Sequence, residues 1–201
     1  RSVAALPLAA RISQGLVFSN RDKRTLLDKL VLILGELAVG QPYYLVADAY
    51  YASRKIALPL LRAGNHLVTR VKSNAVAYFP APVPAKKGPG RPRLYGAKIA
   101  LKPLFDDPGA FRTVESPVYG EEGVTLRLRS LDLLWRPLGV LVRFVAVEHP
   151  TRGRCILMCT DLALDAAGIV ALYGYRFKIE VAFKASLRVL GAFLYHFWMR
   201  G

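Results

Sequence analysis

The sequence predicts an α/β fold, in which strands and helices alternate along the chain. Leucines recur with a helical period in residues 21–37. Two short apolar runs without that period, residues 43–48 and 66–71, have the length of buried strands. A second helical pattern, residues 53–63, separates the two runs. Because strand, helix and strand follow one another in this order, we expect mostly parallel pairing in the sheet.

The first elements have recognisable boundary signals. Residues 2–10 are apolar but contain Pro7, which suits a strand at the margin of a sheet. Ser19-Asn20 is a candidate cap for the first helix, and the Gly-Gln-Pro sequence at residues 40–42 ends it. These signals place the first helix between a marginal strand and a buried one.

The pattern changes in the middle of the chain, where clusters of Pro and Gly separate runs of alternating apolar and polar residues. Residues 124–129 and 140–147 alternate with a period of two, which is typical of antiparallel strands. A further strand pattern at residues 155–160 precedes a long helix that starts near Leu164. The sequence therefore predicts an α/β core and a β-rich insertion, made respectively by residues 1–72 with 151–201, and by residues 73–150.

Composition favours a polyanionic partner. A chain of 201 residues can bury one substantial core, and its formal net charge of +15 accompanies a hydrophobic content of 53%. The apolar content excludes a disordered chain, while the excess of Lys and Arg favours nucleic acid or an anionic membrane surface. No apolar stretch approaches the roughly 18 residues of a spanning helix. We expect no membrane partner and a cytoplasmic, nucleoid-associated location.

The cysteines and histidines do not form a metal-binding pattern. Cys155 and Cys159 are four residues apart on a predicted strand and therefore share a face. A structural zinc site needs further paired ligands, whereas His66, His149 and His196 are isolated from one another in the sequence. We expect buried, reduced thiols.

Two acidic residues lie where a metal site can form. Asp48 ends an apolar run, the position at which a buried strand places a carboxylate at the edge of a sheet. Glu180 lies on a helical stripe that also contains Tyr173, Arg176 and Lys184. Acidic groups on a strand end and on a helix can converge on a divalent ion. On spacing alone, structural roles are commoner: Asp48 can cap the next helix, and Glu180 can pair with neighbouring cations.

These two segments resemble the transposases of bacterial insertion sequences, in the DDE branch of the RNase H-like nucleases. The resemblance is carried by Val-Ala-Asp-Ala-Tyr-Tyr around Asp48 and by the Tyr-x-x-Arg-x-x-x-Glu signature of Tyr173, Arg176 and Glu180. Two further matches, Thr160-Asp161-Leu162 and Leu190-Gly191, agree with it. The resemblance implies an RNase H-like core, a mixed sheet flanked by helices, that is interrupted by a β-rich insertion.

The resemblance also implies an activity. The intact protein would cleave DNA at the ends of a mobile element and transfer the strands to target DNA, as a homodimer in a synaptic complex with double-stranded DNA. Asp48 and Glu180 would be the catalytic residues and would ligate two Mg²⁺ (or Mn²⁺) ions. Tyr173, Arg176 and Lys184 would bind the DNA.

The chain departs from the family pattern at two points. The family places a lysine seven residues after the glutamate, and here that position is Leu187. The family also needs an earlier aspartate on a strand, but the acids before Asp48 are Asp22, Asp28 and Glu36, in or beside a helical pattern. We therefore expect a fragment that begins after the first catalytic strand and is inactive by itself. The alternatives are a non-catalytic DNA-binding remnant and, less favoured, an RNA-binding module.

A second basic motif lies in the predicted insertion. Gly90-Arg91-Pro92-Arg93 looks like an AT-hook, in which Gly and Pro keep the backbone slim while arginines enter the minor groove of A·T-rich DNA. Pro89 replaces the upstream arginine of that motif, and a solvated basic turn is an equally good reading. In a DNA-acting enzyme, Arg91 and Arg93 would form a sequence-tolerant clamp.

Overall fold

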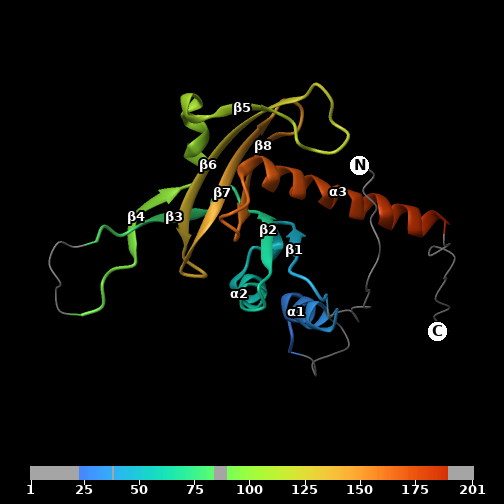
Figure 1. The fold of residues 1–201 in the computed structure, drawn as a ribbon, viewed down its shortest axis with the longest axis horizontal. Helices are drawn as coiled ribbons and strands as arrows, with labels where there is room; N and C mark the ends of the chain where they lie inside the picture. Colours follow the sequence, from blue (N-terminus) through green and yellow to red (C-terminus); the bar gives the residue numbers. More distant parts are fainter. Residues whose placement is uncertain (1–22, 38, 84–89, 190–201) are drawn as a thin grey trace, which may run out of the picture.

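The computed structural model describes residues 23–37, 39–83 and 90–189, and the side chains of this set up to residue 178. Its strands form one mixed sheet with helices on both faces (Figure 1). This is the mixed sheet flanked by helices that the sequence predicts for an RNase H-like core.

The helices are α1 (Leu26–Glu36), α2 (Arg54–Arg62) and α3 (Ala166–Val189), and the short 3-10 turns are η1 (Ala49–Tyr51), η2 (Lys102–Asp106) and η3 (Pro108–Ala110). The strands are β1 (Tyr44–Ala47), β2 (His66–Arg70), β3 (Val76–Pro80), β4 (Tyr95–Ala100), β5 (Arg112–Glu115), β6 (Thr125–Trp135), β7 (Val140–His149) and β8 (Gly153–Cys159).

The order of the strands in the sheet corrects one prediction. The order is β1-β2-β8-β7-β6-β3-β4, and β5 also pairs with β6. β1 and β2 are parallel, with Ala47 opposite Thr69. All other strand pairs in the described part of the chain are antiparallel. The prediction of mostly parallel pairing is therefore wrong, because the chain after β2 folds into hairpins, and a hairpin pairs its strands antiparallel.

The described residues 73–83 and 90–150 contain antiparallel strands, as the alternation at residues 124–129 and 140–147 predicts. These strands continue the sheet of the core, since β7 pairs with β8 from Arg143 to His149, and β8 pairs with β2. Figure 1 shows the long β6–β7 ribbon rising beside β8, with the β3–β4 hairpin at the other end of the sheet. The division of the chain into a core and an insertion stays a prediction.

The first helix begins later than its leucine pattern predicts. The Thr25 hydroxyl accepts a hydrogen bond from the Asp28 backbone N–H, and the Asp28 carboxylate accepts one from the Thr25 backbone N–H. This reciprocal capping box starts the helix at Leu26 instead of residue 21. The predicted cap Ser19-Asn20 and the predicted strand at residues 2–10 lie outside the described residues.

Each face of the sheet has its own apolar cluster. On one face, Ile56 of α2 packs with Leu67 of β2, and α1 covers the same cluster. On the other face, Ile169 of α3 packs against Val68 of β2 and Cys159 of β8. Leu67 and Val68 are adjacent in one strand and therefore point to opposite faces. The result is a three-layer arrangement with α3 on one side and α1 and α2 on the other (Figure 1).

The start of α3 is fixed by a charged side chain from the sheet. Arg143 of β7 donates through Nε and Nη2 to the two carboxylate oxygens of Asp132, both at 2.8 Å, and through Nη1 to the backbone oxygen of Leu164 at 2.8 Å. The Asp165 side chain then accepts a hydrogen bond from the Gly168 N–H at 2.9 Å. The hydrogen bond to Asp132 raises the pKa of Arg143, so the guanidinium stays charged.

A loop between β5 and β6 supports α3 further along. The side chain of Val118 in this loop lies against Gly174, where an added Cβ would come within 2.9 Å of Cγ1 of Val118. Glu121 holds the loop: it accepts one hydrogen bond from the Ser116 hydroxyl, and its carboxylate lies 3.2 Å from Nε2 of His149 and 2.6 Å from Nη2 of Arg152. Burial acts to raise the pKa of Glu121, but these partners lower it overall.

In the part of the chain that the structure describes, no helix is both long and apolar enough to cross a bilayer.

Gly174→Ala tests this contact between α3 and the loop. The added methyl group should strain the contact with Val118 and cost about 1–3 kcal/mol, partly offset by the gain of about 1 kcal/mol from replacing a helical glycine. In a Val118→Ala background the clash disappears, so the same change should be neutral or stabilising. Urea unfolding of the four proteins measures both effects. An equal loss of stability in the two backgrounds would contradict the contact.

Candidate functional site

Asp48 lies at the carboxyl end of β1, as the sequence predicts. Its carboxylate is exposed, and Oδ1 accepts a hydrogen bond from the Tyr50 N–H at 2.9 Å, so that Asp48 caps η1. The structural role considered from the sequence is therefore real. It occupies only one oxygen, and Oδ2 accepts no hydrogen bond from the described residues. One side of the carboxylate is thus open to a ligand.

The backbone of Asp48 is tied to the neighbouring strand. The hydroxyl of Thr69, which is completely buried, donates to the Asp48 carbonyl at 2.6 Å. This bond continues the β1–β2 pairing by one residue beyond Ala47 and Thr69. The position of Asp48 is therefore set by a buried contact with β2.

Arg70 occupies the equivalent position at the end of β2. It follows Thr69, as Asp48 follows Ala47, so the two residues are at the same edge of the sheet. Val46 and Val68 belong to the cluster under α3, and strand alternation therefore directs Asp48 and Arg70 toward that face as well. An anionic and a cationic group thus occur together at the carboxyl ends of the two parallel strands.

Two of the predicted DNA-binding residues lie on α3 near Arg70. Tyr173 is half-buried, and the Arg176 guanidinium carbon is 5.6 Å from the centre of its ring. Burial raises the pKa of the Tyr173 hydroxyl, while Arg176 and Arg70 act in the opposite direction. Tyr173, Arg176 and Arg70 line one cavity of about 340 Å³. The structure therefore gathers these three side chains, two of which the sequence predicts as functional.

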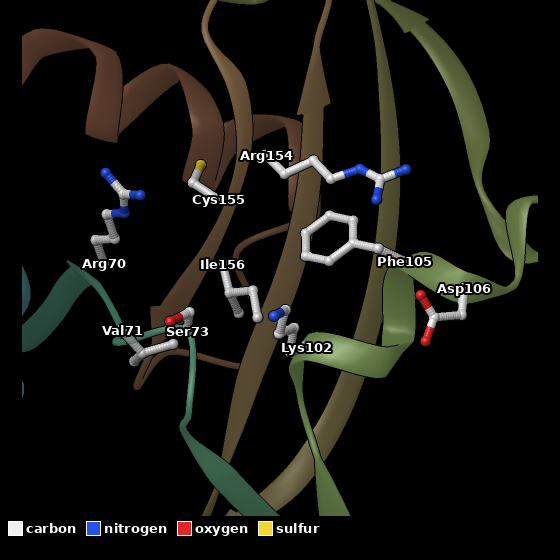
Figure 2. Close-up of a pocket in the computed structure, with 9 residues that line it drawn as sticks. All are labelled: Arg70, Val71, Ser73, Lys102, Phe105, Asp106, Arg154, Cys155 and Ile156. Carbon is white, nitrogen blue, oxygen red and sulfur yellow. The ribbon is translucent and has the colours of Figure 1, made fainter.

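A second, smaller cavity adjoins this one. It has a volume of about 180 Å³ and shares Arg70, Arg154 and Cys155 with the first. Figure 2 shows Arg70 and Cys155 on one side of it and Phe105 with Arg154 on the other. Burial raises the pKa of the Cys155 thiol, and it raises the pKa of Cys159 to about 11. Both cysteines are free thiols and contact the cluster under α3, in agreement with the shared face that the sequence predicts.

Glu180 and Lys184 belong to α3, which packs across β1 and β2. Their side chains lie outside the described residues. The predicted approach of Glu180 to Asp48 and the predicted contact of Lys184 with DNA therefore stay predictions.

Asp161, part of the sequence resemblance, lies at the opposite edge of the sheet from Asp48. It follows β8, which is antiparallel to β2, so it is near the amino ends of β1 and β2. It accepts hydrogen bonds from the Tyr44 hydroxyl and the Ala163 N–H. The bond to Asp161 raises the pKa of Tyr44 to about 12. These contacts indicate a structural role.

Arg91 and Arg93 are far from Asp48 in the sheet. Both are exposed and precede β4, the last strand in the order, whereas Asp48 follows β1, the first strand. Figure 1 shows β4 at the end of the sheet away from β1. Any contact that these two arginines make with DNA would therefore be separate from the site at Asp48.

The earlier acids that the structure describes, Asp28 and Glu36, belong to α1, on the face of the sheet opposite α3. Asp28 is occupied by the α1 cap and by Lys55, 2.9 Å away, and the Thr25 hydrogen bond helps lower its pKa to about 2. Asp22 lies outside the described residues. In the described set, no three acidic, His or Cys side chains are grouped closely enough to hold a metal ion. Asp48 offers the oxygen chemistry that Mg²⁺ prefers, and further ligands must come from elsewhere.

Sequence reasoning missed the three cations of the smaller cavity, Arg70, Lys102 and Arg154, and also Arg152 of the larger one. Arg70 had a signal, because it lies one residue before the end of the predicted strand 66–71, much as Asp48 ends the predicted strand 43–48. Lys102 and Arg154 had none, since they approach Arg70 only through long-range pairing in the sheet.

Comparison with known proteins identifies a family. A family model described as DDE superfamily endonuclease matches residues 9–131, more than half of the chain. The match includes Asp48 and Arg70 and ends before α3. No curated protein matches the chain. On the extent of the family match, the chain belongs to the DDE superfamily of endonucleases.

Proposed function

We propose that the protein is a transposase, which cleaves DNA at the ends of a mobile element and joins those ends to target DNA. The single observation that carries the proposal is the position of Asp48: an exposed carboxylate, with one oxygen open, at the end of a strand inside the family match. The net charge of +15 supports a DNA partner. We place its action on chromosomal DNA in the cytoplasm, in a homodimeric complex with the element ends.

Asp48 and Glu180 are the proposed metal ligands, with a further carboxylate completing the set. Two bound Mg²⁺ ions would supply activation of the attacking oxygen and stabilisation of the leaving oxygen in an in-line displacement at phosphorus. The residues of the chain would do the rest. Arg176 and Lys184 would bind phosphate oxygens, and Tyr173, held half-buried beside Arg176, would contact the nucleotide at the cleaved bond.

Binding of Mn²⁺, followed by electron paramagnetic resonance, tests the metal ligands without requiring activity. Asp48→Asn and Glu180→Gln should each weaken Mn²⁺ binding by about tenfold or more, since each removes a charged oxygen ligand. Glu122→Gln, which changes an exposed carboxylate of the β5–β6 loop, is the matched control and should bind as the unaltered chain does. If Asp48→Asn binds Mn²⁺ normally, the assignment is wrong. A chain that binds DNA but no Mn²⁺ would instead support the non-catalytic DNA-binding remnant.

Thr69 is proposed as a positioning residue for Asp48. Thr69→Val removes the buried bond to the Asp48 carbonyl and should cost on the order of 1 kcal/mol of stability, with weaker Mn²⁺ binding. Thr69→Ser keeps the hydroxyl and should restore the Mn²⁺ affinity even though it leaves a small cavity. If the role of Thr69 were purely structural, both variants would lose stability and both would bind Mn²⁺ with the same affinity as the unaltered chain.

Arg91 and Arg93 are proposed to contact duplex DNA away from the catalytic edge. Each lost phosphate contact lowers the salt dependence of binding by about 0.9 in the log–log slope, so Arg91→Ala with Arg93→Ala should lower it by up to about 1.8. The control removes two exposed cations elsewhere, Arg62 on α2 and Arg112 on β5. Fluorescence anisotropy at several salt concentrations gives the slopes. Equal salt slopes for the variant and the control would mean that Arg91 and Arg93 face solvent and do not contact the DNA.

A further inference from the structure

We propose that the two adjoining cavities beside β2 form a binding groove for one separated DNA strand. The groove consists of the larger cavity, under Tyr173 and Arg176, and the smaller one, shown in Figure 2, and Arg70, Arg154 and Cys155 belong to both. The inference rests on the proposed function for the choice of DNA as the polyanion. It adds a site, and a form of the substrate, that the metal-binding edge alone does not specify.

Charge is the first argument. Five cations line the two cavities, and Asp106 is the one carboxylate among the described residues that line them. Arg152 and Arg154 are paired with Glu121 and Glu148, which lie outside both linings. Arg70 and Lys102 make no ion pair with a described residue. Two cations that face a shared cavity and form no ion pair there attract a ligand that carries repeated negative charges.

Backbone geometry is the second argument. β2 pairs with β8 only as far as the position of Arg70, opposite Leu157, and the chain then leaves toward β3. Residues 153–155 of β8 therefore pair with β7 on one side and have no strand partner on the side of β2, within the described part of the chain. The smaller cavity lies along this open side and contains Arg154 and Cys155. An unpaired strand edge offers main-chain N–H groups, which are good donors to phosphate oxygens.

Aromatic side chains are the third argument. Phe177 lines the larger cavity and is 60% exposed, and half-buried Tyr173 lies beside it. In the smaller cavity, the Arg154 guanidinium carbon lies over the Phe105 ring, 5.2 Å from the ring centre. Grooves for single-stranded nucleic acid combine cations that follow the backbone with aromatic faces on which bases stack. Cavities of about 340 and 180 Å³ have room for phosphates and single bases, whereas a duplex is far wider.

The position of the groove gives it a role. Arg70 is at the strand end beside Asp48, so a strand bound at Arg70 passes next to the candidate catalytic edge. DNA cleavage at an element end leaves strands that must be held apart while one of them reacts. We infer that the groove holds one of these strands during that step.

The test measures binding of a labelled single-stranded DNA oligonucleotide, in EDTA, to the 201-residue chain. Arg70→Ala with Lys102→Ala should weaken binding at least tenfold and lower the salt slope by up to about 1.4, at about 0.7 per phosphate contact on a single strand. The control, Arg62→Ala with Arg112→Ala, removes the same charge from α2 and β5 and should leave binding within about twofold. Circular dichroism checks that each variant is folded.

Alkylation of Cys155 provides a second measurement of oligonucleotide binding in the same groove. Because its thiol lines both cavities, a saturating oligonucleotide should slow its alkylation several-fold, as measured by mass spectrometry. The Arg70 and Lys102 variant should lose this protection, and the control variant should keep it. Equal binding by the two variants, an unchanged alkylation rate, or competition by inorganic phosphate at oligonucleotide-like concentrations would each overturn the groove. Since EDTA excludes divalent metal, failure of the metal site would not affect these results.

Discussion

The pairing of β2 with both of its neighbours is the interaction on which the rest of the structure depends. β2 is parallel to β1 on one side and antiparallel to β8 on the other, and so it joins the first part of the chain to the last. Leu67 and Val68 of β2 are completely buried, one on each face. Through the same strand, Thr69 positions Asp48, and Arg70 enters both cavities. A loss of this pairing would separate the candidate catalytic edge from the groove beside it.

The sequence predicted well those features that depend on neighbouring residues. The strand ending at Asp48, the two helices around it and the hairpin strands later in the chain follow from local periodicity, and the structure has them. The late start of α1 was missed because the Thr25–Asp28 capping box was not recognised in the pattern. The capping residues decide where a helix begins more than the leucine spacing does, since leucines can keep a helical spacing beyond the end of the helix.

Features that depend on distant residues were predicted less well. The direction of β8 beside β2 is decided by how the chain returns after residue 150, which no local pattern encodes. The same return brings Arg154 and Lys102 to Arg70. The motif residues Tyr173 and Arg176 were found because they belong to one short signature, whereas the cations opposite them come from three separate segments. Sequence patterns therefore recovered the part of the site that lies on a single helix.

The way in which α3 is fixed has a mechanical consequence. Arg143 holds Leu164, two residues before the helix begins, and Glu180 is 14 positions beyond Ala166, or about 21 Å along the axis at 1.5 Å per residue. The helix therefore acts as a lever: a tilt of about 5° at its start would move residue 180 by about 2 Å. Displacements of about 1 Å are enough to slow a positioned reaction strongly. An Arg143→Lys change, which leaves the charge and gives up the forked geometry, would thus be felt far from the sheet.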